Sequence, residues 1–419
     1  MGGSASSSQK ANSPRSQVGT FIVKYLFYVS FNMTTGFNTR AVQSGEFRDE
    51  KIGNVTTPIF ETSTFYNPNL NPSAYSDHTR NKPFMYTRWG NPTLEALEKK
   101  YASLDAVEES LSFSTGMGAI TSTVLSLLKK GDRLMSVKEL YGETFIFFTR
   151  FLPSIGIDVD LVRLDELNSG EMDLTGYAGI YTESIVNPTL GVCDIQRLGK
   201  LAAESGIPLL VDATFASPYN QNPSKLGAAF TLHSGTKYIG GHSDILLGLA
   251  GFEKKNMEAV WTKRRLLGAS PDPIQAYLGL RGLKTLGIRM KVHNENALEV
   301  AKFLSQHRKV SRVLYPGLEG FEYNEIAKKN LTGFGGMVSF ELEGGLSSAK
   351  SMAKKLRTFS YAPSLGGVES LFTLPAETSH LNLTPAERRE AGIADGLVRM
   401  SVGIEDKEDL IEDLKTALD

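Results

Sequence analysis

Lys237 lies in a segment whose side chains suit an amine that does covalent chemistry. Residues 234–244 are Ser-Gly-Thr-Lys-Tyr-Ile-Gly-Gly-His-Ser-Asp. The hydroxyl groups can bind a phosphate, and the glycines let the backbone approach a flat ligand closely. A lysine in such a pocket loses hydration and is more easily deprotonated, which imine formation with an aldehyde requires. The pattern indicates a Schiff-base lysine, although a surface lysine in a glycine-rich loop would show the same residues.

A carboxylate follows an apolar run upstream of this lysine. Residues 209–211 are Leu-Leu-Val and are followed by Asp212, which indicates a buried strand of a parallel sheet ending in an acid. Ligands gather at the ends of such strands. An acid there can keep a pyridine nitrogen protonated, as the chemistry of pyridoxal 5'-phosphate (PLP) requires. We assign Asp212 this role; taken alone, it could also cap the next helix.

A phosphate site is predicted where a short strand runs into a helix. Residues 112–119 are Ser-Phe-Ser-Thr-Gly-Met-Gly-Ala, and a helical pattern extends from 119 to 129. Free N–H groups at a helix start, here near Gly116 and Met117, attract a dianion. Two weaker signals are Tyr141, whose ring could stack on a cofactor, and Glu-Ser-Ile-Val-Asn-Pro at 183–188.

Taken in this order, the segments resemble the PLP-dependent enzymes of cysteine and methionine metabolism. This is the trans-sulfuration family of cystathionine γ-synthase, cystathionine γ-lyase, cystathionine β-lyase and methionine γ-lyase. The resemblance runs from about Asn38 to Asp406 and includes residues 86–92, 364–370 and 397–406. It implies an α/β fold with an aspartate-aminotransferase-like (fold type I) large domain, a mostly parallel sheet, and a smaller α+β C-terminal domain.

The resemblance also implies a role for each matching residue. Lys237 would form the imine with PLP and move protons, and Asp212 would bind the pyridine nitrogen. Tyr141 would stack on the ring and assist proton transfer to the leaving group. The other cofactor-binding residues that it implies are Tyr86, Arg88, Gly116, Met117, Asn187, Thr214, Ser234 and Thr236.

The resemblance also places two pairs of residues at the edges of the site. Tyr86 and Arg88 would reach the phosphate from a neighbouring subunit, which implies a homotetramer built from dimers that share active sites. Arg399 would bind the substrate α-carboxylate through its planar fork, with Ser364 nearby. Without the resemblance, Arg399 suits an exposed strand position, Tyr141 a core position, and Tyr86 with Arg88 a solvated loop.

The implied reaction is γ-elimination or γ-replacement on homoserine-derived sulfur amino acids, as in cystathionine γ-lyase or γ-synthase. Three positions where cystathionine enzymes commonly carry charge are Met85, Ile146 and Pro363 here. This favours a shorter or more apolar side chain, so methionine γ-lyase remains an alternative, as does O-acylhomoserine sulfhydrylase. Glu143 replaces a cysteine that is frequent in methionine γ-lyases. A PLP-binding scaffold without turnover is the non-enzyme alternative.

Composition agrees with a metabolic enzyme of the cytoplasm. The 419 residues carry a net charge of −1 without basic runs, which argues against nucleic-acid and membrane partners. The single cysteine, Cys193, excludes an intrachain disulfide and is expected to be buried. The six histidines show no ligand spacing, so no metal is predicted, and His242 is assigned no role.

We expect a disordered leader or tag over residues 1–32, an N-terminal arm contacting a neighbouring subunit over 33–90, a PLP-binding α/β domain over 91–285 and an α+β domain over 286–419. Strands of the α/β domain are predicted at 110–113, 133–137, 157–162, 180–182, 209–211 and 231–233, alternating with helices. A long helical region is expected at 273–307. The smaller domain should have strands at 310–315, 337–341 and 398–402 and helices at 347–357 and 407–418.

Overall fold

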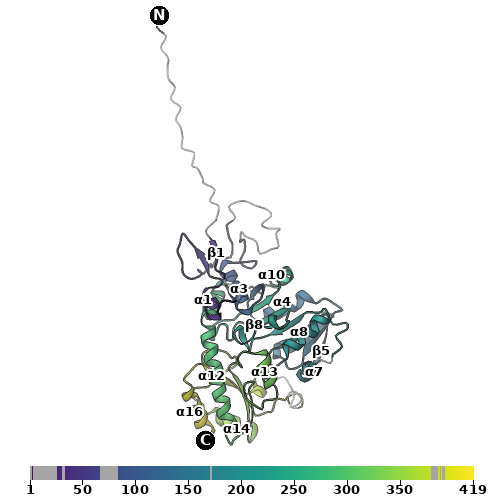
Figure 1. Cartoon of the computed structure of the whole chain (residues 1–419), viewed down its shortest axis with the longest axis vertical. Helices are drawn as coiled ribbons and strands as arrows, with labels where there is room; N and C mark the ends of the chain where they lie inside the picture. The colour runs from purple at the N-terminus through teal and green to yellow at the C-terminus, as the bar shows by residue number, and fades with distance from the viewer. Residues whose placement is uncertain are drawn as a thin grey trace.

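The computed structural model describes Gly2, residues 26–30, 34–66, 84–169, 172–378 and 392–419, and positions 386 and 388. Within these residues the chain forms a larger α/β unit and a smaller unit built on a second sheet (Figure 1). The predicted α/β class is therefore observed.

The larger sheet, as far as the chain is described, has seven strands in the order β3-β9-β8-β7-β6-β4-β5. All are parallel except β9, which pairs antiparallel with β3 and β8. The six predicted strands are confirmed to within one residue at each end. The bounds are β3 (Glu109–Phe113), β4 (Arg133–Val137), β5 (Asp158–Val162), β6 (Gly179–Glu183), β7 (Leu209–Asp212), β8 (Phe230–Ser234) and β9 (Gly248–Phe252).

Strand β9 was not predicted, because its sequence Gly-Leu-Ala-Gly-Phe has weak strand propensity. The adjacent strands β3 and β8 supply its backbone hydrogen bonds. A Cβ atom at Gly248 would lie 2.0 Å from the carbonyl oxygen of Thr115, and one at Gly251 would lie 2.8 Å from Val107. The glycines therefore allow a close approach that a typical strand residue would block.

Helices surround this sheet. They are α3 (Pro92–Asp105), α4 (Gly116–Leu127), α5 (Gly142–Ile146), the π-helix η1 (Phe147–Phe151), α6 (Leu152–Ser154), α7 (Leu164–Ser169), α8 (Ile195–Glu204), α9 (Ser217–Asn220), η2 (Pro223–Leu226), η3 (Lys254–Asn256) and α10 (Met257–Leu267). The predicted helical region at 273–307 is two helices, α11 (Pro273–Lys284) and α12 (Leu286–Ser305). The chain breaks helix geometry at Thr285 between them.

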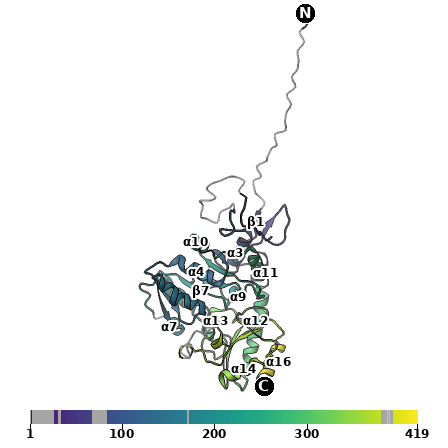
Figure 2. The same cartoon turned by 180° about the vertical axis from the view of Figure 1, so that it is seen from behind.

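The smaller sheet has the order β10-β11-β14-β13-β12, with β12 parallel to β13 and the other pairs antiparallel. Its strands are β10 (Val310–Leu314), β11 (Met337–Leu342), β12 (Ser360–Tyr361), β13 (Leu371–Thr373) and β14 (Leu397–Ser401), and its other elements are α13 (Asn324–Asn330), α14 (Gly345–Ala353), η4 (Pro375–Glu377) and α16 (Lys407–Leu418). The short strands β12 and β13 were not predicted. Helices α12, α14 and α16 gather around this unit (Figures 1 and 2).

The N-terminal segment packs on the larger unit. Strand β1 (Leu26–Tyr28) pairs antiparallel with β2 (Phe47–Asp49), and α1 (Phe37–Gln43) lies between them in the chain. The hydroxyl of Tyr28 donates to Glu95 at 3.0 Å. Residues 26–30 were predicted to belong to a disordered leader, but they are part of the fold. The proposed domain boundaries remain predictions.

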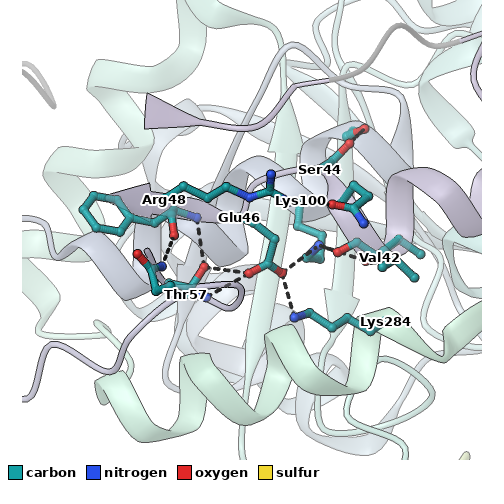
Figure 3. A network of polar contacts seen from close by, with 12 residues as sticks. Val42, Ser44, Glu46, Arg48, Thr57, Lys100 and Lys284 are labelled. Carbon is teal, nitrogen blue, oxygen red and sulfur yellow. Dashed lines mark hydrogen bonds and ion pairs between the residues drawn. The ribbon is translucent and has the colours of Figure 1, made fainter. Parts of the chain in front are cut away.

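A cluster of charged and polar side chains binds this segment to the larger unit (Figure 3). We call the cluster the arm latch; it consists of Glu46, Thr57, Lys100 and Lys284. The Glu46 carboxylate lies 3.3 Å from the Lys100 amine and 2.9 Å from the Lys284 amine. It also accepts a hydrogen bond from the backbone of Thr57 at 2.9 Å. Lys100 donates in addition to the carbonyl oxygens of Ala41 and Val42, at 2.8 and 3.1 Å. The latch joins the arm to α3 and α11.

In the described part of the chain, no helix combines the length and apolar character that a membrane span needs.

Candidate active site

The residues expected to do chemistry gather at one edge of the larger sheet. Tyr141 follows β4, Asn187 follows β6, Asp212 ends β7 and Lys237 follows β8. Because these strands are parallel, their carboxyl ends lie at the same edge. The sheet topology therefore brings together residues that are up to 96 positions apart in the sequence.

Lys237 is partly buried, and its amine donates to the hydroxyl of Ser364 at 2.8 Å. Burial, helped by the charge of Arg399, lowers the pKa of Lys237 to about 8. The lysine is therefore not the exposed loop residue that its segment also allowed. A pKa near neutrality suits both imine formation and proton transfer.

Arg399 comes from β14, the central strand of the smaller sheet, and is only 5% exposed. Its guanidinium donates to the side-chain oxygen of Asn187 at 2.9 Å and to the carbonyl oxygen of Ser364 at 3.1 Å. Burial lowers the pKa of Arg399 to about 10. The alternative of an exposed strand position is wrong. Among the described residues, its Nε is buried without a hydrogen-bond partner, so the guanidinium keeps a donor for a ligand.

Ser364 contacts both Lys237 and Arg399, and its backbone is strained. Its φ of 92° lies in the left-handed region, which non-glycine residues seldom adopt. Such outliers persist where the surroundings fix them and are frequent at ligand sites. Here the strain presents the Ser364 hydroxyl to Lys237 and its carbonyl to Arg399.

Asp212 is partly buried at the end of β7, and its carboxylate accepts a hydrogen bond from the backbone of Thr214 at 2.9 Å. The next helix, α9, has Ala216 at its N-cap, so Asp212 does not cap it. Burial raises the pKa of Asp212. An acid in this position would gain from a cationic partner such as a protonated pyridine nitrogen.

Two of the predicted phosphate ligands, Gly116 and Met117, lie at the start of α4. Thr115 is the N-cap, and its hydroxyl accepts from the Gly118 N–H at 2.9 Å. The N–H groups of Gly116 and Met117 belong to the first helical turn, which lacks intrahelical acceptors. A Cβ atom at Gly116 would lie 2.9 Å from the Ser234 side chain, so this glycine leaves space against β8.

The loop after β8 completes this region. The Ser234 N–H donates to the Thr214 hydroxyl at 2.8 Å. The Thr236 hydroxyl accepts from the Leu247 N–H at 3.0 Å. The helix start and the hydroxyl groups can donate to a phosphate, the amine of Lys237 can react with an aldehyde, and the acid of Asp212 can accept from a protonated pyridine nitrogen. These residues therefore fit PLP.

Tyr86 and Arg88 form a pair outside this cluster. Arg88 donates to the carbonyl oxygen of Arg265 in α10 at 2.9 Å and lies 5.3 Å from the centre of the Tyr86 ring. Tyr86 is 40% exposed. Within one chain the pair therefore matches the solvated-loop alternative, and a cofactor contact would have to be made to another subunit.

Tyr141 is 46% exposed, so it is not the core residue that the sequence also allowed. Burial, followed by the charge of Glu143, raises its pKa, so the phenol holds its proton. Glu143 and Pro363 are exposed, and Met85 and Ile146 are partly buried.

Sequence reasoning assigned no role to Glu183, the last residue of β6. It is 6% exposed, and its carboxyl group accepts a hydrogen bond from the Tyr141 N–H at 2.6 Å. The signal was the one used for Asp212, an acid at the end of an apolar strand. Cys193 is buried as expected, and burial raises its thiol pKa to about 12. In the described residues, no group of three or more His, Cys, Asp or Glu side chains could hold a metal ion.

Comparison with known proteins decides the family. The model of the Cys/Met metabolism PLP-dependent enzymes matches residues 38–419. The chain belongs to this family. It is therefore a PLP-dependent enzyme of the trans-sulfuration group, and the predictions of an enzyme and of PLP as its cofactor are confirmed.

Individual relatives cover nearly the whole chain. Cystathionine γ-lyase from Dictyostelium discoideum is 40% identical over 91% of this chain and 97% of its own. L-methionine γ-lyase from Fusobacterium nucleatum subsp. polymorphum is 41% identical over 92% of this chain and 98% of its own. The structure of cystathionine γ-synthase from Xanthomonas oryzae pv. oryzae has a TM-score of 0.85 at 36% identity, covering 92% of this chain and 98% of that one. The expected fold is confirmed.

Proposed function

We propose that this enzyme catalyses γ-elimination or γ-replacement on homoserine-derived sulfur amino acids, in the manner of cystathionine γ-lyase and γ-synthase. One observation carries the proposal. Arg399 of the smaller sheet contacts Asn187 of the larger unit, and Ser364 links Arg399 to the amine of Lys237. A carboxylate bound by Arg399 would therefore lie beside the amine that moves protons.

Substrate binding begins at the guanidinium. A planar fork binds a carboxylate through two parallel hydrogen bonds, and burial strengthens them. The present contacts of Arg399 to Asn187 and Ser364 fix the plane of the fork. This positions the substrate Cα near Lys237, which we assign as the base that removes the Cα proton.

The other side chains divide the remaining work. PLP supplies an electron sink for the charge that develops at Cα. Asp212 would hold a proton on the pyridine nitrogen, Asn187 would bind the phenolic oxygen, and the α4 start would hold the phosphate with Thr214, Ser234 and Thr236. Tyr141 would stack on the ring and assist departure of the γ-substituent, because its raised pKa keeps the phenol protonated.

Methionine γ-lyase activity is a second candidate, which one observation favours. Met85, Ile146 and Pro363 replace three charges that cystathionine enzymes commonly use. An apolar distal pocket would bind a short thioether better than the zwitterionic end of cystathionine.

Release of 2-oxoacid and ammonia from the PLP-loaded enzyme separates these candidates. L-cystathionine, L-methionine and O-acylhomoserines are each tested alone, with L-cysteine and with sulfide, and the amino-acid products are identified as well. 2-Oxobutanoate from cystathionine, or cystathionine from an acylhomoserine and cysteine, supports the first proposal. Preferential turnover of methionine supports the second, and sulfide-dependent turnover of an acylhomoserine would indicate a sulfhydrylase. No turnover of any of them would contradict all three.

We propose further that the enzyme is a cytoplasmic homotetramer built from dimers that share active sites. The side chains of Leu246, Leu266 and Ile274 are apolar and 61%, 68% and 46% exposed. Leu266 follows Arg265, whose carbonyl oxygen accepts from Arg88, and Leu246 lines the same hollow as Ser270. Ser270, whose hydroxyl donates to the Arg88 carbonyl at 2.8 Å, lines a hollow of about 560 Å³ on the same surface. Apolar patches beside a hollow are typical of association surfaces.

Subunit mixing tests the shared site. Arg88→Ala and Lys237→Ala are each expected to be nearly inactive alone. Mixed, denatured together and refolded with PLP, they should regain activity, because one site of each hybrid dimer has both residues. Failure to regain activity in confirmed hybrids would contradict a site shared through Arg88.

A further inference from the structure

A second carboxyl group ends the strand next to Asp212. Glu183 is the last residue of β6, and its Cα is paired in register with that of Asp212 on β7. The Ser184 N–H donates to the Asp212 carbonyl at 2.8 Å, which continues the pairing past the strand end. Glu183 thus lies at the carboxyl edge of the sheet, where the active-site residues gather, although no role in the reaction is assigned to it.

The side chain of Glu183 connects two active-site loops. Its carboxyl oxygen accepts from the Tyr141 N–H at 2.6 Å, across 42 residues of sequence. The Asn187 N–H faces the same carboxyl group and acts to lower its pKa. Tyr141 is the N-cap residue of α5, so this hydrogen bond fixes the backbone of the residue at which the helix begins.

To accept hydrogen bonds from these N–H groups, the Glu183 side chain must be long enough to approach them, but it need not be ionised. Burial and the neighbouring charge of Asp212 raise its pKa, while the N–H groups of Tyr141 and Asn187 oppose the rise. Glu139 also faces it and adds to the rise. Two ionised carboxylates side by side in a buried place are unfavourable. A neutral carboxyl group still accepts hydrogen bonds through its carbonyl oxygen.

We propose that Glu183 is a positioning residue, whose carboxyl oxygen holds the Tyr141 and Asn187 backbones so that the Tyr141 ring and the Asn187 amide meet the cofactor. This deepens the proposed function and rests on the roles assigned there to Tyr141 and Asn187. A buried N–H that loses its acceptor destabilises its loop. The two loops would then adopt other positions, and both cofactor contacts would weaken together.

A matched pair of variants distinguishes the effect of side-chain length from the effect of charge at position 183. Glu183→Gln keeps the length and an acceptor oxygen but no charge, whereas Glu183→Asp keeps the charge but is one methylene shorter. We expect Glu183→Gln to bind PLP within about threefold of wild type and Glu183→Asp to bind at least about tenfold more weakly. PLP affinity is measured by equilibrium dialysis, and thermal melting confirms folding of each variant.

Kinetics give a second readout. Glu183→Asp should lower kcat by about tenfold or more, whereas Glu183→Gln should keep kcat within about threefold of wild type. The control is Glu139→Gln, since Glu139 accepts from the Leu164 N–H at 3.1 Å and touches neither loop N–H; its PLP affinity should match wild type.

The outcomes are distinct. Wild-type PLP affinity and kcat in Glu183→Asp would overturn the positioning role, as would damage in Glu183→Gln equal to or greater than that in Glu183→Asp, because charge would then matter instead. If no tested substrate is turned over by wild type, the proposed function fails, but the dialysis result still decides the role of Glu183.

Discussion

Lys100, which is buried, and Lys237, which is partly buried, have the same lowered pKa but different tasks. Burial is the main cause in both Lys100 of the arm latch and Lys237 of the active site, and each pKa falls to about 8. Lys100 is 0% exposed and directs its donors at two carbonyl oxygens and Glu46 (Figure 3). Lys237 has a hydroxyl partner, Ser364, and a guanidinium neighbour, Arg399, that lowers its pKa further.

The partners, and not the pKa, distinguish the two lysines. An ammonium has three donors, and those of Lys100 are engaged in structural contacts, so it cannot reach a ligand. Lys237 lies beside a cation, where its neutral form is favoured, and at the edge of a sheet where ligands bind. A perturbed pKa therefore identifies a reactive amine only together with its surroundings.

The largest expected effect is on turnover in Lys237→Ala. Removing the proton-transfer amine should lower kcat by on the order of 10²–10⁴-fold, because general acid–base catalysis contributes that much. Borohydride should trap PLP on wild type but not on the variant, measured by mass spectrometry. Trapping of PLP at another lysine, such as Lys100, would contradict the assignment of Lys237 as the reactive amine and Lys100 as a structural one.

Lys100→Ala should instead reduce stability. Breaking a buried ion pair costs about 3–5 kcal/mol, and Lys284 remains to compensate part of the Glu46 charge. The free energy of unfolding is measured with urea at fixed protein concentration. Activity per folded molecule should stay near wild type. An inactive but stable Lys100→Ala enzyme would contradict a purely structural role.

Arg399→Ala should retain PLP but lose about 2–5 kcal/mol of transition-state stabilisation, since truncating a buried charged contact has this effect. The loss is read from kcat/KM, and PLP content from absorbance. Arg399→Lys should restore little of the lost kcat/KM, because an ammonium group lacks the planar, two-pronged donor geometry of the guanidinium. Unchanged kinetics would remove Arg399 from the site.

The smallest effect is a pH dependence of stability. The folded-state pKa of Lys100 lies at about 8, below the ordinary lysine value of 10.5, so between these values the unfolded state binds more protons. Stability from this group therefore rises with pH between about 8 and 10.5, by roughly 1–3 kcal/mol. Lys100→Met should lack this rise in urea unfolding of the PLP-bound enzyme. An equal rise in both proteins would assign it to other groups.

Local sequence was sufficient for the elements that have one dominant pattern. Strand β4 (Arg133–Val137) and helix α16 (Lys407–Leu418) match their predictions at both ends, because the hydrophobic period and the turn residues mark them. Strand β9 has no such pattern. It exists because β3 and β8 both offer it hydrogen bonds and its glycines let α4 approach.

The same division holds for the site. Residue type and spacing indicated Lys237 and Asp212, and the family resemblance added Arg399, Ser364 and Asn187. Glu183 was missed because its partner, the Tyr141 N–H, is 42 residues away. The assignments of Tyr86 and Arg88 depend on a second subunit and stay predictions.

The sequence by itself determined the chemistry available to this protein: an amine, an acid, a helix start and an arginine in the order of a known family. Only the tertiary structure decided which lysine is reactive and which is structural. Side-chain chemistry is local, but burial, partners and pKa arise from residues distant in the sequence, such as Ser364 beside Lys237 and Glu46 beside Lys100.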